Sequence, residues 1–413
     1  MAVITNPSAS LSATSAKKNY TWPLVLVTSL FFLWGLSYGL LDVLNKHFQE
    51  TMHVTKMRTT LLQLAYFGAY FVIALPAGYF MKKFGYKKGI LTGLLLYVTG
   101  ALLFYPSAEM ASFNFFLLSL FIIACGLGFL ETAANPYITV LGKPESSTFR
   151  LNLSQSFNGV GTFIGPIIGA RLFFNDIHAA ADQLSSVKYV YLVIGAVVGL
   201  IALLFLRTSL PEIKEEELVT DQEQHSGHTL FGHRHFVWAV VAQFFYVGAQ
   251  VGIAALFINY CTELGLHISS QDASYYLLAG MLCFTIGRFA GTALMKKVPP
   301  ATLLAVYAAI NMVLCAVLAQ WHTQVSIYLL IAVFFFESIM FPTIFALGVR
   351  NLGRYTKQGS SYIIMSIVGG VPVSMLMGYI ATQYSTPLAY FIPVVCFLVV
   401  FLFGWYGYKI KKS

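Results

Sequence analysis

Apolar residues form long runs along almost the whole chain, and each run is about as long as a membrane is thick. A helix of roughly 20 apolar residues crosses a hydrocarbon core of about 30 Å. Such runs begin near Trp22 and are separated by short polar segments. The pattern predicts twelve membrane-spanning helices, at about 22–45, 60–82, 89–107, 113–141, 151–174, 188–206, 236–260, 274–295, 300–320, 325–347, 360–383 and 387–408.

The composition supports this interpretation. Of the 413 residues, 58% are hydrophobic and 10% are charged, whereas a soluble domain carries roughly 25% charged residues. The first apolar run is too long for the core of a signal peptide and is followed by further spans, so we expect it to be a retained helix. The expected fold class is therefore an all-α integral membrane protein.

The longest polar interruption, at 207–234, follows the sixth span and is rich in acidic residues. Such a segment is typical of a solvated linker. We expect a cytoplasmic tail at 1–21, a six-helix half at 22–206, a cytoplasmic linker at 207–234, a second six-helix half at 235–408 and a tail at 409–413.

The net charge of +9 is explained by topology. Most lysines and arginines fall on one side of the twelve-span arrangement, in pairs such as Lys82/Lys83 and Lys296/Lys297. This asymmetry follows the positive-inside rule and predicts cytoplasmic termini, with no nucleic-acid partner. The five cysteines lie in or beside apolar runs without paired spacing. They indicate no disulfide framework, and we expect no metal site and no cofactor.

The two halves carry related motifs. Glu131 is followed by Pro136, and Glu337 is followed by Pro342 at the same spacing, with an offset of 206 residues (337 − 131). A second correspondence pairs Gly35 with Gly248, at an offset of 213 residues (248 − 35). Duplicated halves of this kind are typical of membrane transporters, whose substrate binds between the halves.

Three acidic residues lie well inside predicted spans: Asp42, Glu131 and Glu337. A carboxylate in hydrocarbon faces a polar cavity, pairs with a cation or stays protonated. An acid that exchanges its proton between two conformations would couple proton flow to transport. The alternatives are structural pairing of Glu131 with Arg150 or another helix, neutralisation of Asp42 by Lys46, and either substrate contact or structural pairing for Glu337.

Neutral polar residues supply the other candidate contacts. Asn135 follows Glu131 by one helical turn, Gln155 and Asn158 share the fifth span, and Gln250 lies in the seventh. Amides beside aromatic residues such as Tyr38 suit a polyhydroxylated ligand, because hydroxyls bond the amides and sugar C–H faces lie on aromatic rings. The alternative is that these amides bond to neighbouring helices.

The chain closely resembles the fucose–galactose–glucose:proton symporters of the major facilitator superfamily. The segments that carry the resemblance cover essentially all twelve spans, and the run from Glu131 to Pro136 is specific to this family. The matching segments include Ser29–Trp34, Pro76–Lys83, Gly128–Pro136, Arg150–Gln155, Tyr246–Gln250, Gly287–Thr292 and Pro342–Phe345.

The resemblance implies that Asp42 and Glu131 are the two working acids, one concerned with the proton and one with the sugar, and that Gln155 and Asn158 line the cavity. The chain departs from the family pattern in Ser37–Leu41, where that pattern is rich in Asn, and in Val251–Ala255, where it has aromatic residues. Glu337 has no acidic counterpart in that pattern. The transport class therefore follows from the resemblance, whereas the particular sugar does not.

We therefore expect a monomeric, multi-pass protein of the cell inner membrane that imports a monosaccharide with a proton. The sugar is L-fucose-like, or galactose or glucose, with N-acetylglucosamine or another sugar as the alternative. A non-transporting sugar receptor lacks a soluble domain to pass on a signal, and an exporter of lipophilic compounds fits the amides poorly. No catalytic motif indicates an enzyme.

Overall fold

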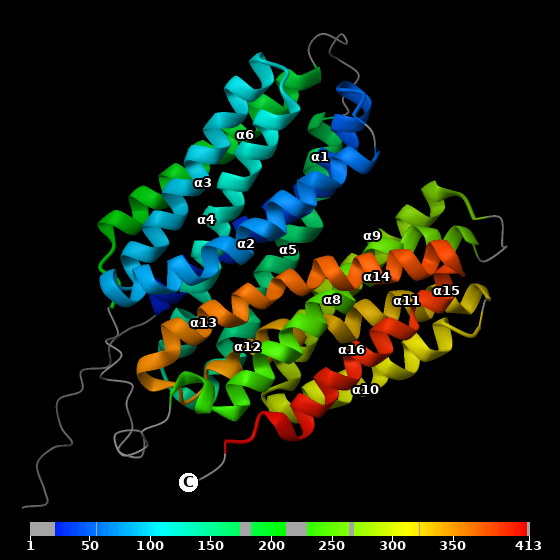
Figure 1. The fold of residues 1–413 in the computed structure, drawn as a ribbon. Coiled ribbons are helices and arrows are strands. Elements are labelled where there is room, and N and C mark those ends of the chain that lie inside the picture. The colour runs from blue at the N-terminus through cyan, green and yellow to red at the C-terminus, as the bar shows by residue number, and fades with distance from the viewer. Residues whose placement is uncertain are drawn as a thin grey trace, which may run out of the picture.

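The computed structural model describes residues 21–54, 56–173, 183–211, 229–263, 268–321 and 323–410. Within them, every regular element is a helix. The first half contains α1 (Thr21–Thr51), α2 (Lys56–Phe84), α3 (Tyr86–Glu109), α4 (Phe113–Val140), α5 (Ser147–Phe173) and α6 (Gln183–Arg207). Figure 1 shows these helices as one bundle, set beside a second bundle made by the rest of the chain.

The second half begins with long helices and ends with interrupted ones. It contains α8 (Arg234–Glu263), α9 (Ser270–Leu294), α10 (Pro300–Leu318), α11 (Gln324–Glu337), α12 (Met340–Val349), α13 (Thr356–Met365), α14 (Gly370–Gln383), α15 (Thr386–Ala389) and α16 (Phe391–Leu402). Short 3₁₀ turns lie at Pro144–Ser146, Leu230–Gly232, Gly353–Tyr355 and Ser366–Gly369, and a π turn at Phe403–Gly407 follows α16.

All twelve predicted spans are present as helices in the described part of the chain. By length and composition, eleven of the helical stretches are apolar enough to cross a membrane. The remaining one is α5, which has 27 residues but carries Asn152, Gln155 and Asn158. Its polar side chains do not need to face lipid, because α5 packs against α1 and against α9 of the other half.

Three predicted spans are interrupted: the twelfth is broken at Tyr390 between α15 and α16, and the other two breaks lie near the cavity. The tenth is divided at Ser338–Ile339 into α11 and α12, and the eleventh changes to a 3₁₀ turn at Ser366–Gly369 between α13 and α14. The apolar pattern does not reveal such breaks, because it reports burial and not backbone geometry. Each of these two breaks lies next to residues that line the space between the halves, including Phe341 and Ile367.

Close helix packing repeats in the two halves. A Cβ on Gly35 of α1 would lie 2.0 Å from the carbonyl oxygen of Asn158 in α5, so only glycine fits there. The related Gly248 of α8 faces Val373 and the carbonyl oxygen of Gly369 in the corresponding eleventh span. The first helix of each half is therefore packed against the fifth helix of the same half.

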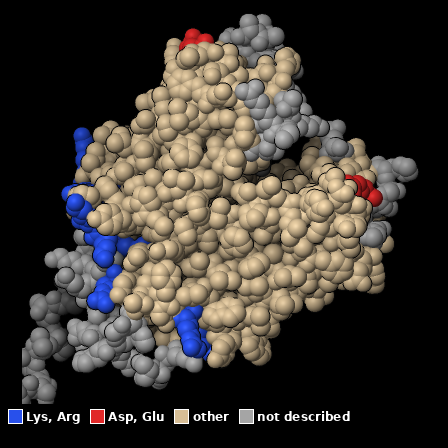
Figure 2. All heavy atoms as spheres, in the orientation of Figure 1, with Lys and Arg blue, Asp and Glu red and all other residues tan. Residues whose placement is uncertain are grey.

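Basic side chains gather at one end of the molecule, where Figure 2 shows them in blue. They lie at the end of α2, at the start of α3, at the end of α6, just after α9 and in the connection that joins α12 to α13. Lys87 also caps the end of α6, since its amine donates to the carbonyl oxygens of Leu206 and Thr208. The opposite end carries a Lys188–Glu109 ion pair of 2.6 Å. The basic residues thus mark one face of the membrane domain.

Candidate functional site

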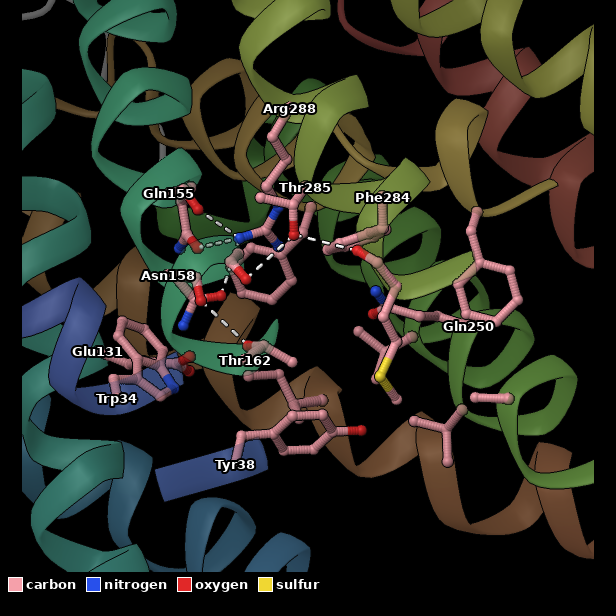
Figure 3. A pocket seen from close by; sticks show the side chains of 18 of the residues that line it. Trp34, Tyr38, Glu131, Gln155, Asn158, Thr162, Gln250, Phe284, Thr285 and Arg288 are labelled. Atoms are coloured by element: carbon pink, nitrogen blue, oxygen red, sulfur yellow. Dashed lines mark hydrogen bonds between the residues drawn. The ribbon is translucent and has the colours of Figure 1, made fainter. Parts of the chain in front are cut away.

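A cavity of about 160 Å³ lies between the two halves (Figure 3). Its walls come from α1, α2, α4 and α5 of the first half, and from α8, α9, α11, α12 and the 3₁₀ turn after α13 in the second. The lining residues are Trp34, Tyr38, Tyr66, Phe67, Tyr70, Glu131, Gln155, Asn158, Gly159, Thr162, Val247, Gln250, Val251, Ala254, Met281, Phe284, Thr285, Arg288, Phe334, Phe341 and Ile367.

The wall from the first half is the more polar one. Helix α4 is buried from Ile123 to Thr139, so Glu131 can only face the interior of the protein, and it is 5% exposed. Its Oε2 atom has no hydrogen-bond partner among the described residues. A buried acidic group without a partner is costly unless it binds a proton or a ligand. Glu131 therefore places a buried, incompletely bonded carboxyl group in the wall of the cavity.

The wall from the second half is mainly apolar. Val247, Val251, Met281 and Phe334 contribute hydrocarbon and aromatic surface, and Gln250 is one of a few polar members of this wall. The cavity therefore has two chemically different sides. A ligand that fits it needs hydroxyl or similar groups on one face and C–H surface on the other.

Arg288 of α9 crosses from the second half to the first. Its Nη1 atom donates to Asn158 Oδ1 at 2.8 Å, to Gln155 Oε1 at 3.3 Å and to the carbonyl oxygen of Gln155. Its Nε atom donates to the carbonyl oxygen of Ser338 at 3.1 Å, and its guanidinium lies 4.5 Å from the centre of the Phe284 ring. Figure 3 shows this side chain directed at the two amides.

Gln155 also forms a hydrogen bond with a residue of α4. Its Nε2 atom donates to Asn135 Oδ1 at 3.2 Å. Asn135 is fully buried and does not line the cavity. The amide of Gln155 is therefore fixed between Asn135 on one side and Arg288 on the other. Such a preset amide presents its remaining hydrogen-bonding capacity in one orientation.

The structure brings together five of the residues that the sequence singled out: Tyr38, Glu131, Gln155, Asn158 and Gln250 all line the cavity. Asn135 supports the wall without lining it. Glu337 lies outside the cavity and is fully buried in the second half. Asp42 falls within α1, but its side chain lies outside the described residues. The same is true of Lys46, its suggested partner.

Arg150 is not the partner of Glu131. It donates to the carbonyl oxygens of Ile138, Thr139 and Lys143, and so it caps the end of α4. The residue that sequence reasoning missed is Arg288, which lies inside the predicted span 274–295 but was not among the candidate contacts. The available signal was a single arginine enclosed by apolar residues and glycines in 284–291, since a charged residue inside a span is by default a functional candidate.

The two halves touch each other on the side of the cavity toward the basic end. Ser360 Oγ donates to the carbonyl oxygen of Thr132 at 3.0 Å, and Asn152 Nδ2 donates to Thr343 Oγ1 at 3.2 Å. The Lys357 amine lies 4.7 Å from the centre of the Tyr86 ring. On the other side of the cavity, the surface in Figure 2 is hollowed between the halves. The cavity is therefore closed toward the basic end.

The model of the Major Facilitator Superfamily matches residues 26–374. The chain belongs to this superfamily of membrane transporters and is not an enzyme. Within the superfamily, it is a member of the family of fucose–galactose–glucose:proton symporters. It is 42% identical to the L-fucose-proton symporter of Escherichia coli, over 94% of this chain and 93% of that protein.

Two further comparisons support the assignment. The chain is 34% identical to a glucose/galactose transporter of Brucella abortus, with 96% of each chain covered. The crystal structure of the transporter FucP in the outward conformation superimposes with a TM-score of 0.86, at 40% identity, and covers 95% of this chain and all of that one. The expected fold, two six-helix halves of the major facilitator type, is confirmed.

Proposed function

We propose that this protein imports a monosaccharide together with a proton, by alternating access of the central cavity to the two sides of the membrane. The observation that carries the proposal is the buried carboxyl of Glu131, which faces a cavity lined with amides and aromatic rings. It is supported by the similarity to proteins named as an L-fucose-proton symporter and a glucose/galactose transporter.

The sugar would bind with its hydroxyl groups toward the first half. Glu131, Gln155 and Asn158 provide donors and acceptors there, and Gln250 provides one amide from the opposite wall. The aromatic rings of Trp34 and Tyr38 suit the C–H faces of a pyranose. We propose an L-fucose-like sugar, galactose or glucose as substrate, with N-acetylglucosamine as the alternative.

The proton would be carried by Glu131, with Asp42 as the second coupling acid on the strength of the family resemblance. A carboxyl that is buried without a cation within ion-pair distance is stable in its neutral form. Opening to the side of higher pH allows it to lose that proton to water. If sugar binds well only to the protonated form, movement of the two solutes is linked.

The conformation fits an outward-facing carrier. We infer that the basic end is cytoplasmic, from the positive-inside rule, and the halves are in contact at that end. Both termini would then be cytoplasmic and the protein would lie in the cell inner membrane as a monomer. Residues 22–206 and 235–408 would move as two bodies, joined by the cytoplasmic linker 207–234.

Uptake of labelled sugar into proteoliposomes with an imposed inward proton gradient tests the proposal. The panel is L-fucose, D-galactose, D-glucose and N-acetylglucosamine. We expect accumulation of at least one of them and none by Glu131→Gln, which cannot bind and release a proton. The matched control is Glu109→Gln, because Glu109 lies at the surface beside Lys188. Undiminished uphill uptake by Glu131→Gln would refute its proton role.

A further inference from the structure

The second half contains an acidic residue that the central cavity does not use. Glu337 is the last residue of α11 and is 0% exposed. Both of its carboxyl oxygens lack a hydrogen-bond partner among the described residues. Phe334 and Phe341, three residues before it and four residues after it, line the cavity, whereas Glu337 itself does not.

Other buried polar groups of the second half also lack partners in the described structure. They are both side-chain atoms of Gln243 in α8, Oδ1 of Asn311 in α10 and the hydroxyl of Tyr390 at the start of α16. Tyr246, one turn from Gln243, donates its hydroxyl to the carbonyl oxygen of Glu337 at 3.1 Å. Asn311 Nδ2 donates to the carbonyl oxygen of Val333, one turn before Glu337, at 3.3 Å. The core of this half is therefore polar around the end of α11.

The titratable groups that interact electrostatically with Glu337 come from the surrounding helices. They are the phenol of Tyr246 on α8, the thiol of Cys315 on α10 and the phenol of Tyr390 beside α16. Arg288 on α9 directs its Nε atom to the carbonyl oxygen of Ser338 instead of to the carboxyl. Thiols and phenols are poor ligands for hard cations such as Na⁺ or Mg²⁺. A proton neutralises the Glu337 carboxyl without needing any further ligand, so it suits this closed site.

The position of Glu337 connects it to the moving parts. The helix break Ser338–Ile339 follows it directly. Arg288 contacts that break through Ser338, and contacts the first half through Asn158. Any rearrangement of the break therefore alters both the surroundings of Glu337 and the link between the halves.

We infer that Glu337 is a further proton-binding site, which belongs to the second half and is separate from Glu131 and Asp42 in the first half. The carboxyl holds its proton in the conformation seen here. When the break between α11 and α12 rearranges during the transport cycle, the Glu337 carboxyl dissociates. Its proton passes to water, and the carboxylate remains. Each turnover then moves one proton more than the acids of the first half alone would carry. The inference rests on the proposed proton-coupled transport.

The test is the proton-to-sugar ratio in proteoliposomes, measured from the electrochemical gradient at which net sugar flux reverses. Glu337→Gln keeps the size and neutral polarity of the protonated acid but cannot exchange a proton. We expect it to retain sugar counterflow within about twofold of the unaltered protein, because counterflow needs no net proton movement. The number of protons that this variant moves per sugar should be one lower than in the unaltered protein. The pH profile of its uptake should lack one titration step.

A wild-type ratio and pH profile in Glu337→Gln would overturn the inference and identify Glu337 as a permanently neutral core residue. If Glu337→Gln does not fold, Glu337→Asp keeps an acid at the site. Infrared difference spectra with and without sugar should then show a protonated-carboxyl band that differs between Glu337→Asp and the unaltered protein. An identical band in the two proteins would also overturn the inference. Failure of the proposed function itself is distinct, because the unaltered protein would then show no counterflow or no sugar accumulation driven by a proton gradient.

Discussion

The guanidinium of Arg288 in the second half donates to Asn158 Oδ1 in the first half at 2.8 Å. The same guanidinium group also reaches Gln155 and, through Nε, the carbonyl oxygen of Ser338 at the break between α11 and α12. One side chain thus joins a wall of the cavity, the partner half and an interrupted helix. If α9 moved away from α5 during transport, the hydrogen bonds from Arg288 to Asn158 and Gln155 would have to break and reform.

The first prediction concerns the fork geometry of Arg288. Lysine keeps the positive charge but presents a single ammonium group, so it cannot serve acceptors on α5 and Ser338 together. A hydrogen bond from a charged group contributes about 1.5–3 kcal/mol. We expect Arg288→Lys to lower the kcat/KM of sugar uptake by about tenfold or more. The control is Arg171→Lys at the exposed end of α5. Uptake within about twofold of normal in Arg288→Lys would contradict the prediction.

The second prediction uses a pair of glycines. A Cβ on Gly35 would lie 2.0 Å from the carbonyl oxygen of Asn158, whereas a Cβ on Gly68 of α2 would meet no atom within 4 Å. Gly35→Ala should separate α1 from α5 and destabilise the protein by at least about 1–3 kcal/mol. Gly68→Ala should leave stability unchanged or raise it by up to about 1 kcal/mol through helix propensity. Thermal unfolding of the two purified variants in detergent compares them directly, and equal melting temperatures would refute the packing argument.

The positions of the spans could be predicted from the sequence because hydrocarbon thickness sets their length. The acid at Glu131 could be found for a related reason, since a charged group inside an apolar run has few structural explanations. The direction in which such a side chain points is set by packing between helices distant in sequence. Glu131 and Glu337 carry the same motif, yet one lines the cavity and the other is buried behind its wall. The single sequence contains no signal for that difference.

Arg288 shows a second limit of sequence reasoning. Its charge and its apolar surroundings were visible, but its partners Gln155 and Asn158 lie more than 120 residues away in the chain. Contacts between the halves depend on the conformation of the carrier as well as on the fold. The breaks at Ser338–Ile339 and Ser366–Gly369 are not visible in the apolar pattern. Pro342 and Pro372 are the local signal for them, because each lies four residues after a carbonyl in the break and cannot donate a helical hydrogen bond to it.

The third prediction compares an asparagine that supports the cavity wall, Asn135, with one that joins the two halves, Asn152. Asn135→Ala removes the acceptor for Gln155 Nε2, so the Gln155 amide loses its fixed orientation. At about 1 kcal/mol for a neutral hydrogen bond, the Kd for the transported sugar should rise about fivefold. Asn152→Ala is the matched control, since Asn152 bonds to Thr343 across the halves and does not line the cavity. Isothermal titration should show a weaker Kd in Asn135→Ala alone. The reverse pattern would mean that Asn135 does not position Gln155.

The last prediction concerns closure at the basic end. A Cβ on Gly78 of α2 would lie 2.9 Å from the Cβ of Ser361 in α13, and disulfides join Cβ atoms about 3.5–4.5 Å apart. If α2 and α13 move apart by under about 1 Å, the two Cβ atoms reach the distance that a disulfide needs. Gly78→Cys and Ser361→Cys can then form a bridge. Oxidation should hold the halves together on this side, stop uptake and leave sugar binding intact, and reduction should restore uptake. The control pair, Gly68→Cys with Ser361→Cys, should not cross-link, because Gly68 has no neighbour within 4 Å of its Cβ position. Full uptake by the cross-linked protein would show that the contact between α2 and α13 persists throughout the cycle, and would exclude alternating access by separation of the halves at this end.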